Sequence, residues 1–394
     1  MQELLLVGVG MMGRPYVTAA RRLGLRVRAV ETEARAGLVR PEVDALHLTR
    51  GDLDEQWAEA AFAAIADGPP GGVIAFTEWQ VLAAALVQDR LGVPGPSLHA
   101  SMVSRNKALQ RGLFAAAGVP QPEYTVVPAL AEATAWALPR LPVVVKPLSS
   151  AGSVGVELVA TAAEFAAAAG RRSGPLIVET AVEGPEYSWE GFARDGQVWL
   201  GHVTAKQTTG PPYFVEIQHR GGVHFHGTPA DQVAGLVGRV LDALGMRTGI
   251  VHLEFRLTPA GPVLMEVAVR TPGGYIMDLV GLTYGIDPYE IAVRLAMGLP
   301  LPPAPEAPVS CAATILPTTP CGRVVAIDGL AEVRSHPHVT DAGTWAEVGG
   351  TVASQPSGFG RVSYAVLSAP DPSALDEAIA FAGSRLRVRT EPVP

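Results

Sequence analysis

Two glutamates lie on opposite arms of a predicted β-hairpin. Glu254 and Glu266 belong to apolar runs that flank the turn formers of residues 258–262. If the loop is those five residues, Leu257 pairs with Val263 and Glu254 lies opposite Glu266. Opposed side chains have Cβ atoms roughly 4.5–5.5 Å apart, and two carboxylates about 4 Å apart repel by about 4 kcal/mol at an effective dielectric of about 20. Such a pair needs positive charge between its members.

A divalent cation carried by a nucleotide would supply that charge. Mg²⁺ takes one or two carboxylates together with phosphate oxygens, so Glu254 and Glu266 are candidate metal ligands. On the first strand, alternation predicts a core face formed by Val251, Leu253, Phe255 and Leu257. On the second strand it places Leu264 on the same face as Glu266. The alternative is a solvated face on which Arg256 and Arg270 screen the two acids.

Lysine is rare in this chain, which makes its positions informative. Of 30 basic residues only Lys107, Lys146 and Lys206 are lysine. Arginine serves elsewhere, so lysine is expected where a compact, flexible ammonium is needed. Lys146 lies in the apolar run 143–147, and a charge at such a position normally meets an anion. The alternative is that these lysines persist by chance.

A small, glycine- and serine-rich loop, residues 149–156, follows Lys146 directly. Its backbone N–H groups could cradle phosphate, and its hydroxyls add donors. It is not a P-loop, because the lysine precedes the glycines and no helix follows directly. The alternative is an ordinary hairpin turn, which explains the glycines but not the lysine.

Composition excludes several classes of protein. The formal charge of −8 and the pI near 5.6 argue against a nucleic-acid partner. No apolar run reaches membrane-spanning length and the N-terminus lacks the pattern of a signal peptide, so no membrane partner is expected. Cys311 and Cys321 are too few for a disulfide framework. We therefore expect a cytoplasmic enzyme.

The N-terminus predicts a Rossmann-like βαβ unit. An apolar strand over residues 3–9 runs into a GxGxxG turn, a helix follows to about residue 23, and a second strand ends at Glu31. The glycines of the turn are Gly8, Gly10 and Gly13. This fingerprint also supports an alternative function, a nicotinamide-dependent oxidoreductase. Glu78 follows a further predicted strand, at the end where open α/β sheets place ligand contacts.

Proline- and glycine-rich breaks divide the rest of the chain. We expect α/β and α+β architecture with a Rossmann-like domain over 1–97, a nucleotide-binding domain over 98–300 with a lid over about 122–178, and a small C-terminal α/β lobe over 301–394. Within the second part, residues 101–117 predict one amphipathic helix.

The order of these parts resembles the ATP-grasp superfamily over nearly the whole chain. It is most similar to carboxylate–amine ligases of the L-amino acid ligase type, which are related to biotin carboxylase and carbamoyl phosphate synthetase. The resemblance implies a split ATP-grasp fold and ATP with Mg²⁺, or Mn²⁺ in its place, on Glu254 and Glu266. It implies nucleotide contacts at two lysines, the phosphate loop, the adenine hinge and a ribose carboxylate. These residues are Lys107, Lys146, Ser149, Ser150, Gly152, Ser153, Val154, Glu179, Thr180, Ala181, Val182 and Glu186.

The same resemblance implies catalytic residues. Arg270 would stabilise the transferred phosphoryl group, Glu216 would hold an amino group, and His219 would orient the second substrate or take its proton. Lys206 completes the predicted catalytic set. One position departs from the family, because Ala268 stands where the family has an asparagine after the second metal carboxylate.

The implied reaction is ATP-dependent formation of an amide or peptide bond through an acyl phosphate, with small-molecule carboxylate and amine substrates, expected to be amino acids. Relatives of this kind are often homodimers. Three other functions stay open at this stage: an ATP-dependent carboxylase, the nicotinamide-dependent oxidoreductase, and a non-catalytic ATP sensor, which Ala268 would suit.

Overall fold

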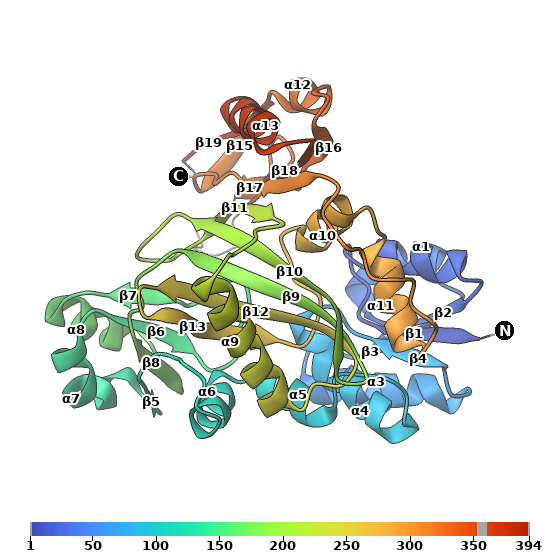
Figure 1. Cartoon of the computed structure of the whole chain (residues 1–394), viewed down its shortest axis with the longest axis horizontal. Helices are drawn as coiled ribbons and strands as arrows, with labels where there is room; N and C mark the ends of the chain where they lie inside the picture. The colour runs from blue at the N-terminus through green and yellow to red at the C-terminus, as the bar shows by residue number, and fades with distance from the viewer. Residues whose placement is uncertain (1, 353–360, 393–394) are drawn as a thin grey trace.

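The computed structural model describes residues 2–352 and 361–392. A parallel four-stranded sheet opens the chain, shown at the right of Figure 1. Its strands in spatial order are β3 (Ala45–Thr49), β2 (Arg26–Thr32), β1 (Glu3–Val7) and β4 (Gly72–Ile74). The helices of this part are α1 (Arg14–Arg22), α2 (Glu33–Val39), α3 (Asp54–Ala66) and α4 (Val81–Leu91). The Rossmann-like expectation is confirmed by this parallel topology.

A second four-stranded sheet, which we call the lid sheet, lies at the left of Figure 1. Its strands in spatial order are β5 (Tyr124–Val127), β8 (Leu176–Thr180), β6 (Val143–Pro147) and β7 (Glu157–Val159). Helices α7 (Thr134–Ala137) and α8 (Ala162–Arg171) belong to the same part. Phe165 and Ala168 of α8 pack with Val143, Val145 and Val178 of the sheet, so the lid has a small core of its own.

The central sheet has eight strands and reaches into the C-terminal part of the chain. Its strands in spatial order are β13 (Gly261–Ala268), β12 (Gly249–Thr258), β9 (Glu186–Arg194), β10 (Gln197–Thr208), β11 (Glu216–Gly221), β14 (Cys311–Ile315), β18 (Ser363–Ala369) and β16 (Val339–Thr344). The C-terminal lobe is therefore continuous with the sheet that carries Glu254 and Glu216.

The remaining elements flank this sheet. Its helices are α5 (Leu98–Ser104), α6 (Lys107–Ala116), α9 (Thr228–Leu244), α10 (Ile276–Tyr284) and α11 (Pro288–Ala296). The C-terminal part adds α12 (Leu330–Arg334), α13 (Pro372–Arg385) and a small sheet of β17 (Thr351–Val352), β15 (Gly322–Asp328) and β19 (Arg387–Glu391). Leu236 and Val240 of α9 pack against Leu253 and Phe255 of β12, which leaves the opposite sheet face for polar residues.

The hairpin differs from the sequence expectation in its turn. Thr258 pairs with Gly261, so the loop is shorter than residues 258–262, and Leu257 pairs with Pro262 instead of Val263. A register shift between Glu254 and Phe255 then restores the predicted pairing of Glu254 with Glu266. Because of the shift, Leu264 lies in the core beside Phe255, and its assignment to the face of Glu266 was wrong. Val251, Leu253 and Phe255 are buried as predicted, whereas Leu257 is only partly buried.

The single helix predicted over residues 101–117 is two helices, α5 and α6. Asn106 ends the first because its backbone is extended, with φ −137° and ψ 116°. Its side chain accepts hydrogen bonds from the N–H groups of Ala108 and Leu109 and so caps α6. Lys107, the first residue of α6, then contacts the loop that follows β6, at the carbonyls of Leu148 and Ser150.

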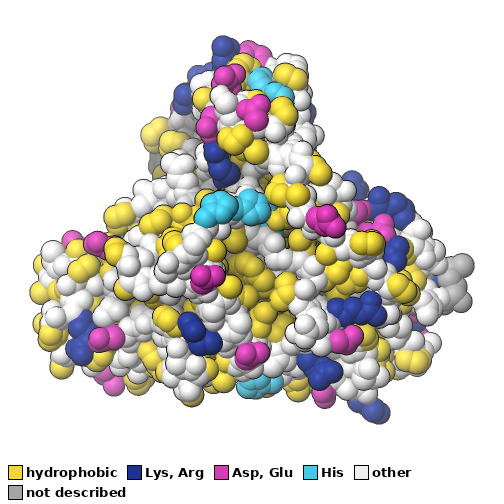
Figure 2. Space-filling view, in the orientation of Figure 1, with side chains coloured by type: hydrophobic (Ala, Val, Ile, Leu, Met, Phe, Trp, Pro, Cys, Tyr) yellow, Lys and Arg dark blue, Asp and Glu magenta, His cyan; other side chains and the backbone are white. Residues whose placement is uncertain are grey.

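Basic and acidic side chains are interspersed on the face shown in Figure 2, without a continuous basic patch. In the part of the chain that the structure describes, no helix combines the length and apolar character that crossing a bilayer would demand.

Candidate active site

Polar side chains occupy successive rows across the central sheet, on the face away from α9. In one row Lys206 of β10 pairs with His219 of β11 and with Glu186 of β9. In the next, Ser188 lies between Thr204 and Glu254, and Glu254 pairs with Glu266. Strand pairing therefore brings residues as far apart in the sequence as Glu186 and Glu266 into one polar face.

Each of the two hairpin glutamates has a lysine partner. Lys107 Nζ lies 3.0 Å from Glu266 Oε1, and Lys206 Nζ lies 2.5 Å from Glu254 Oε1. Burial would raise the pKa of Glu254, but Lys206 and His252 outweigh it and hold the pKa well below its ordinary value. Lys206 and His252 thus favour the ionised form of Glu254.

The donor set fits a divalent cation that brings some of its own ligands. Among residues 2–352 and 361–392, no cluster of three or more His, Cys, Asp or Glu side chains could hold a metal alone. Glu254 and Glu266 form an opposed pair of carboxylates, and the lysine contacts of both fall on Oε1. Two carboxylates completed by phosphate oxygens are a common environment for Mg²⁺.

Lys146 meets a buried anion, as its place in an apolar strand predicted. Its Nζ lies 2.7 Å from Glu179 Oε2, and Arg111 Nε lies 2.8 Å from Glu179 Oε1. Burial alone would raise the pKa of Glu179, but Lys146 and Arg111 lower it to about 2. The Glu179 side chain is 1 % exposed, so any contact of this residue with a nucleotide must be made by its backbone.

The serine- and glycine-rich loop lies beside Lys107. Lys107 Nζ donates to the carbonyl of Ser150 at 3.3 Å, and its backbone N–H donates to the carbonyl of Leu148. Gly152 and Ser153 have φ values of +63° and +60°, and the Ser150 hydroxyl donates to the carbonyl of Val154. Ser149 begins this loop. The loop is therefore folded onto the same lysine that contacts Glu266.

The predicted hinge leads from the lid sheet to the central sheet. The backbone N–H groups of Thr180 and Ala181 donate to the carbonyls of Glu123 and Pro142. The Val182 carbonyl accepts from Arg256 Nη1 at 2.7 Å. The same arginine pairs with Glu186, Nη2 to Oε2, at 2.8 Å. Arg256 thus joins the hinge to the predicted ribose carboxylate, a role that its sequence position did not reveal.

Glu216 is the centre of a second cluster of charges. Lys206 Nζ lies 2.5 Å from its Oε1, and His219 Nε2 lies 3.1 Å from its Oε2. Arg361, which is 145 residues downstream, places Nη1 3.5 Å from Oε2 and 3.2 Å from the Glu216 carbonyl. Burial would raise the pKa of Glu216, but Lys206 and His219 hold it well below the ordinary value.

Lys206 connects the two clusters, because it contacts both Glu216 and Glu254. Its side chain is 1 % exposed. Burial would lower the pKa of Lys206, yet the charges of Glu216 and Glu254 raise it well above its ordinary value. A charged lysine therefore links the candidate metal ligands to the Glu216–His219 pair.

Arg270 and Gly274 lie on the turn after β13. Arg270 Nε donates to Glu78 Oε2 at 2.7 Å, which brings a residue of the N-terminal part into the site. The Gly274 carbonyl lies 3.0 Å from His219 Nδ1, and a Cβ at Gly274 would come within 2.4 Å of the His219 ring. The space beside Gly274 is thus filled by His219, and the glycine permits this close approach.

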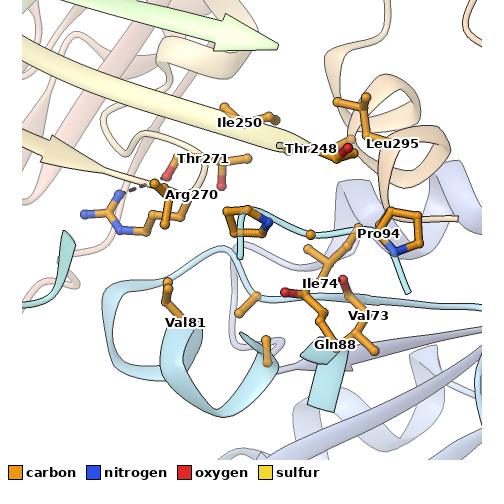
Figure 3. A pocket seen from close by; sticks show the side chains of 18 residues that line it. Val73, Ile74, Val81, Gln88, Pro94, Thr248, Ile250, Arg270, Thr271 and Leu295 are labelled. Carbon is orange, nitrogen blue, oxygen red and sulfur yellow. Dashed lines mark hydrogen bonds between the residues drawn. The ribbon is translucent and has the colours of Figure 1, made fainter. Parts of the chain in front are cut away.

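A small cavity of about 60 Å³ lies behind Arg270, at the joint between the N-terminal part and the central sheet. Its lining is largely apolar and includes Ile74, Val81 and Ile250. Figure 3 shows the Arg270 guanidinium pointing away from the cavity. The cavity therefore contacts the stem of Arg270 and not its charged end.

The N-terminal glycine turn is occupied by the protein's own carboxylate. Glu31 Oε2 accepts hydrogen bonds from the N–H groups of Val9 at 2.9 Å and Gly10 at 2.7 Å. Glu31 is fully buried. The Glu31 carboxylate accepts from backbone N–H groups that a dinucleotide pyrophosphate would need. This geometry argues against the oxidoreductase alternative.

Sequence reasoning missed several residues that the fold brings into the site. Arg111 and Arg361 were overlooked because arginine is common in this chain, so its positions carry little signal, and Arg256 was considered only as a residue that screens the two hairpin acids. His252 and Glu190 were overlooked because each looks isolated until β9 and β12 are paired.

Two parts of the chain match the models of known protein families. Residues 139–278 match the profile of the ATP-grasp domain, and residues 315–391 match the L-amino acid ligase C-terminal domain 2. The L-amino acid ligase structure from Bacillus licheniformis superposes with a TM-score of 0.86 over 99 % of both chains, at 22 % identity.

Two curated relatives extend these matches. Carnosine synthase 1 of Gallus gallus is 31 % identical over 390 residues, covering 87 % of this chain and 41 % of that protein. The chain therefore spans less than half the length of the carnosine synthase. A formate-dependent phosphoribosylglycinamide formyltransferase of Synechococcus sp. is 27 % identical over 76 % of either chain.

Proposed function

This chain belongs to the ATP-grasp superfamily of ATP-dependent ligases, and we propose that it joins a carboxylate to an amine as an amide or peptide bond, with amino acids as substrates. In the proposed reaction a substrate carboxylate oxygen attacks the γ-phosphorus of ATP, which forms an acyl phosphate and releases ADP. The amine nitrogen then attacks the acyl carbon, loses a proton and displaces phosphate.

The nucleotide would lie between the lid sheet and the central sheet. Lys107 and Lys146 would donate to its phosphates, together with the loop residues Ser149, Ser150, Gly152, Ser153 and Val154. The backbone from Glu179 through Thr180 and Ala181 to Val182 would face adenine, and Glu186 would hold the ribose. Support comes from the Arg256 contacts, which tie Val182 to Glu186.

Glu254 and Glu266 would hold a Mg²⁺ ion, or Mn²⁺ in its place. When bound, that ion neutralises phosphate charge and so makes the γ-phosphorus easier to attack. Lys107 and Lys206 would then exchange carboxylate partners for phosphate oxygens. Both lysines lie within 3.0 Å of the glutamates that would bind the ion, so each lysine adjoins the candidate metal site.

The substrates would lie on the other side of Lys206. Glu216 would pair with a substrate amino group, and His219 would orient the amine that attacks or accept its proton. Arg270 would donate to the acyl phosphate, while Glu78 holds its Nε at 2.7 Å and so sets the direction of the guanidinium.

The observation that carries this proposal is the position of Lys206. Its Nζ lies 2.5 Å from Glu254 Oε1 and 2.5 Å from Glu216 Oε1, so a single side chain adjoins the candidate nucleotide–metal site and the candidate substrate site. Transfer of a phosphoryl group from ATP to a second substrate requires the two sites to be adjacent in this way.

The test is a matrix of amino acid pairs incubated with ATP and Mg²⁺, scored for ADP release and for condensed product by mass. The proposal expects ADP and an amide in equal amounts for at least one pair. ADP release that depends on bicarbonate and not on a second amino acid would favour the carboxylase alternative. Nucleotide binding without turnover for every pair would favour the sensor.

A further inference from the structure

A row of hydrogen-bonded side chains leads across the central sheet to Glu254. His252 Nε2 lies 3.1 Å from Glu254 Oε1, and His252 Nδ1 lies 2.9 Å from Glu190 Oε1. Thr204 Oγ1 donates to the other oxygen of Glu190 at 2.9 Å. These residues come from the adjacent strands β10, β9 and β12, so the row runs across the sheet and ends at the candidate metal ligand.

Burial of these charged and polar side chains costs free energy of desolvation. Glu190 is fully buried at 0 % exposure, and the His252 side chain is 10 % exposed. An ionised carboxylate in such a place destabilises the fold unless its oxygens are bonded. Each ring nitrogen of His252 faces a carboxylate oxygen. The ring is therefore held between Glu190 on its Nδ1 side and Glu254 on its Nε2 side.

The effect on Glu254 is to restrict its orientation. Its bonds to Lys206 and to His252 both end on Oε1. Two donors on Oε1 restrict rotation of the carboxylate, and neither of these bonds uses Oε2. Lys206 cannot serve this purpose alone, because it is shared with Glu216 and would turn to phosphate oxygens in the proposed reaction. The imidazole is rigid and is held from behind by Glu190.

We propose that Glu190 and His252 are positioning residues that orient Glu254 for magnesium carried by the nucleotide. This inference rests on the proposed function, since it assumes that Glu254 is a metal ligand. Partners behind a ligand commonly change metal affinity by about 10- to 100-fold when they are replaced. Ala268, which pairs with His252 across the hairpin, carries only a methyl group at the position beside the ring.

The test compares two substitutions of the same residue. His252→Asn can keep a donor near the Nδ1 position, toward Glu190, and loses the one toward Glu254. His252→Gln extends further and can keep the donor near the Nε2 position, toward Glu254. ADP affinity is measured by calorimetry on the full chain, with MgCl₂ and with EDTA, so that the readout is binding and not turnover.

We expect ADP to bind the wild-type chain more tightly with MgCl₂ than with EDTA, and we call the ratio of the two affinities the Mg²⁺ gain. His252→Asn should reduce the Mg²⁺ gain by about 10-fold or more. His252→Gln should keep most of the gain, and metal-free ADP affinity should be unchanged in both. Val27→Ala, a buried substitution in the N-terminal sheet, controls for lost stability and should retain the full gain. Thr204→Val removes only the hydroxyl bonded to Glu190 and is the second variant to test should His252→Asn fail to fold. It should also reduce the increase in ADP affinity that Mg²⁺ gives.

Equal Mg²⁺ gains in wild type, His252→Asn and Thr204→Val would overturn the inference and leave the proposed function standing. Equal losses in His252→Asn and His252→Gln would also overturn it, because they would show that the contact with Glu254 does not matter. Absence of any Mg²⁺ gain in the wild-type chain would instead overturn the proposed metal role of Glu254 and Glu266, on which the inference depends.

Discussion

Lys107 Nζ lies 3.0 Å from Glu266 Oε1, so a proposed phosphate-binding lysine is paired with a proposed metal ligand. Lys206 and Glu254 repeat the arrangement at 2.5 Å. Without nucleotide, these opposite charges neutralise one another and the buried groups are satisfied. A nucleotide with its metal brings phosphates for the two lysines and a cation for the two glutamates, so every member of both pairs would gain a new partner of opposite charge.

Glu266→Gln should abolish ADP formation. The substitution removes the charge that would hold the metal and frees Lys107 from its partner. Metal-free ADP should therefore bind as tightly as in the wild type, or more tightly, while the gain from Mg²⁺ disappears. Calorimetry measures both quantities. The Glu266 side chain is 32 % exposed, so stability should change little. Retained turnover would contradict the metal role, and the exposed Glu306→Gln is the matched control.

Lys146→Arg should lower kcat/KM for ATP by about 100-fold, as expected when a donor to developing charge is misplaced. The Lys146 side chain is 8 % exposed, and Arg111 already occupies the other oxygen of Glu179. A planar guanidinium in that slot cannot keep the contact with Glu179 and also reach a phosphate. Steady-state kinetics measure the effect. Wild-type rates would show that lysine is not specifically required there.

Glu179 should make stability depend on acid pH. Its pKa is about 2 in the folded chain, against 4.5 ordinarily, because Lys146 and Arg111 outweigh burial. A carboxyl group whose pKa is lower in the folded than in the unfolded chain stabilises the fold at pH values above its ordinary pKa. This stabilisation, roughly 3 kcal/mol in total, is lost as the pH falls from about 4.5 to about 2. Urea unfolding at several pH values should show Glu179→Gln destabilised at pH 7 and approaching the wild type toward pH 3. A difference independent of pH would contradict this account.

Arg361→Met should weaken binding of the amino substrate and spare ATP. Arg361 contacts both the side chain and the carbonyl of Glu216, 3.5 Å and 3.2 Å away. Without it Glu216 loses a restraint, and we expect KM for the amino acid to rise by about 10-fold, in line with the loss of a charged hydrogen bond. Equal increases in KM for ATP and for the amino acid would contradict a role on the substrate side. Arg361→Lys should have an intermediate effect.

Local patterns predicted the parts of this molecule that depend on nearby residues. Alternation along 250–256 identified the core face of β12, and the cost of a lysine in an apolar strand predicted an anion near Lys146. The break at Asn106 could also have been found, because asparagine is a preferred helix N-cap.

Other features depend on long-range packing and leave little local trace. The register shift after Glu254 adds a residue to one strand without a change in hydrophobic pattern, so Leu264 was placed on the wrong face although the pairing of Glu254 with Glu266 was right. Arg361 reaches Glu216 because β14 and β18 extend the central sheet, and strand order is not encoded in the spacing of either residue. The Glu190–His252 contact likewise exists only once β9 and β12 are paired.

The most direct test of the acyl phosphate is transfer of oxygen from the carboxylate substrate. The amino acid pair that releases most ADP would be used, with ¹⁸O in the carboxylate that forms the amide, and the released phosphate would be analysed by mass. This account predicts one ¹⁸O atom in each inorganic phosphate formed together with ADP. Unlabelled phosphate, or label found in AMP, would contradict it.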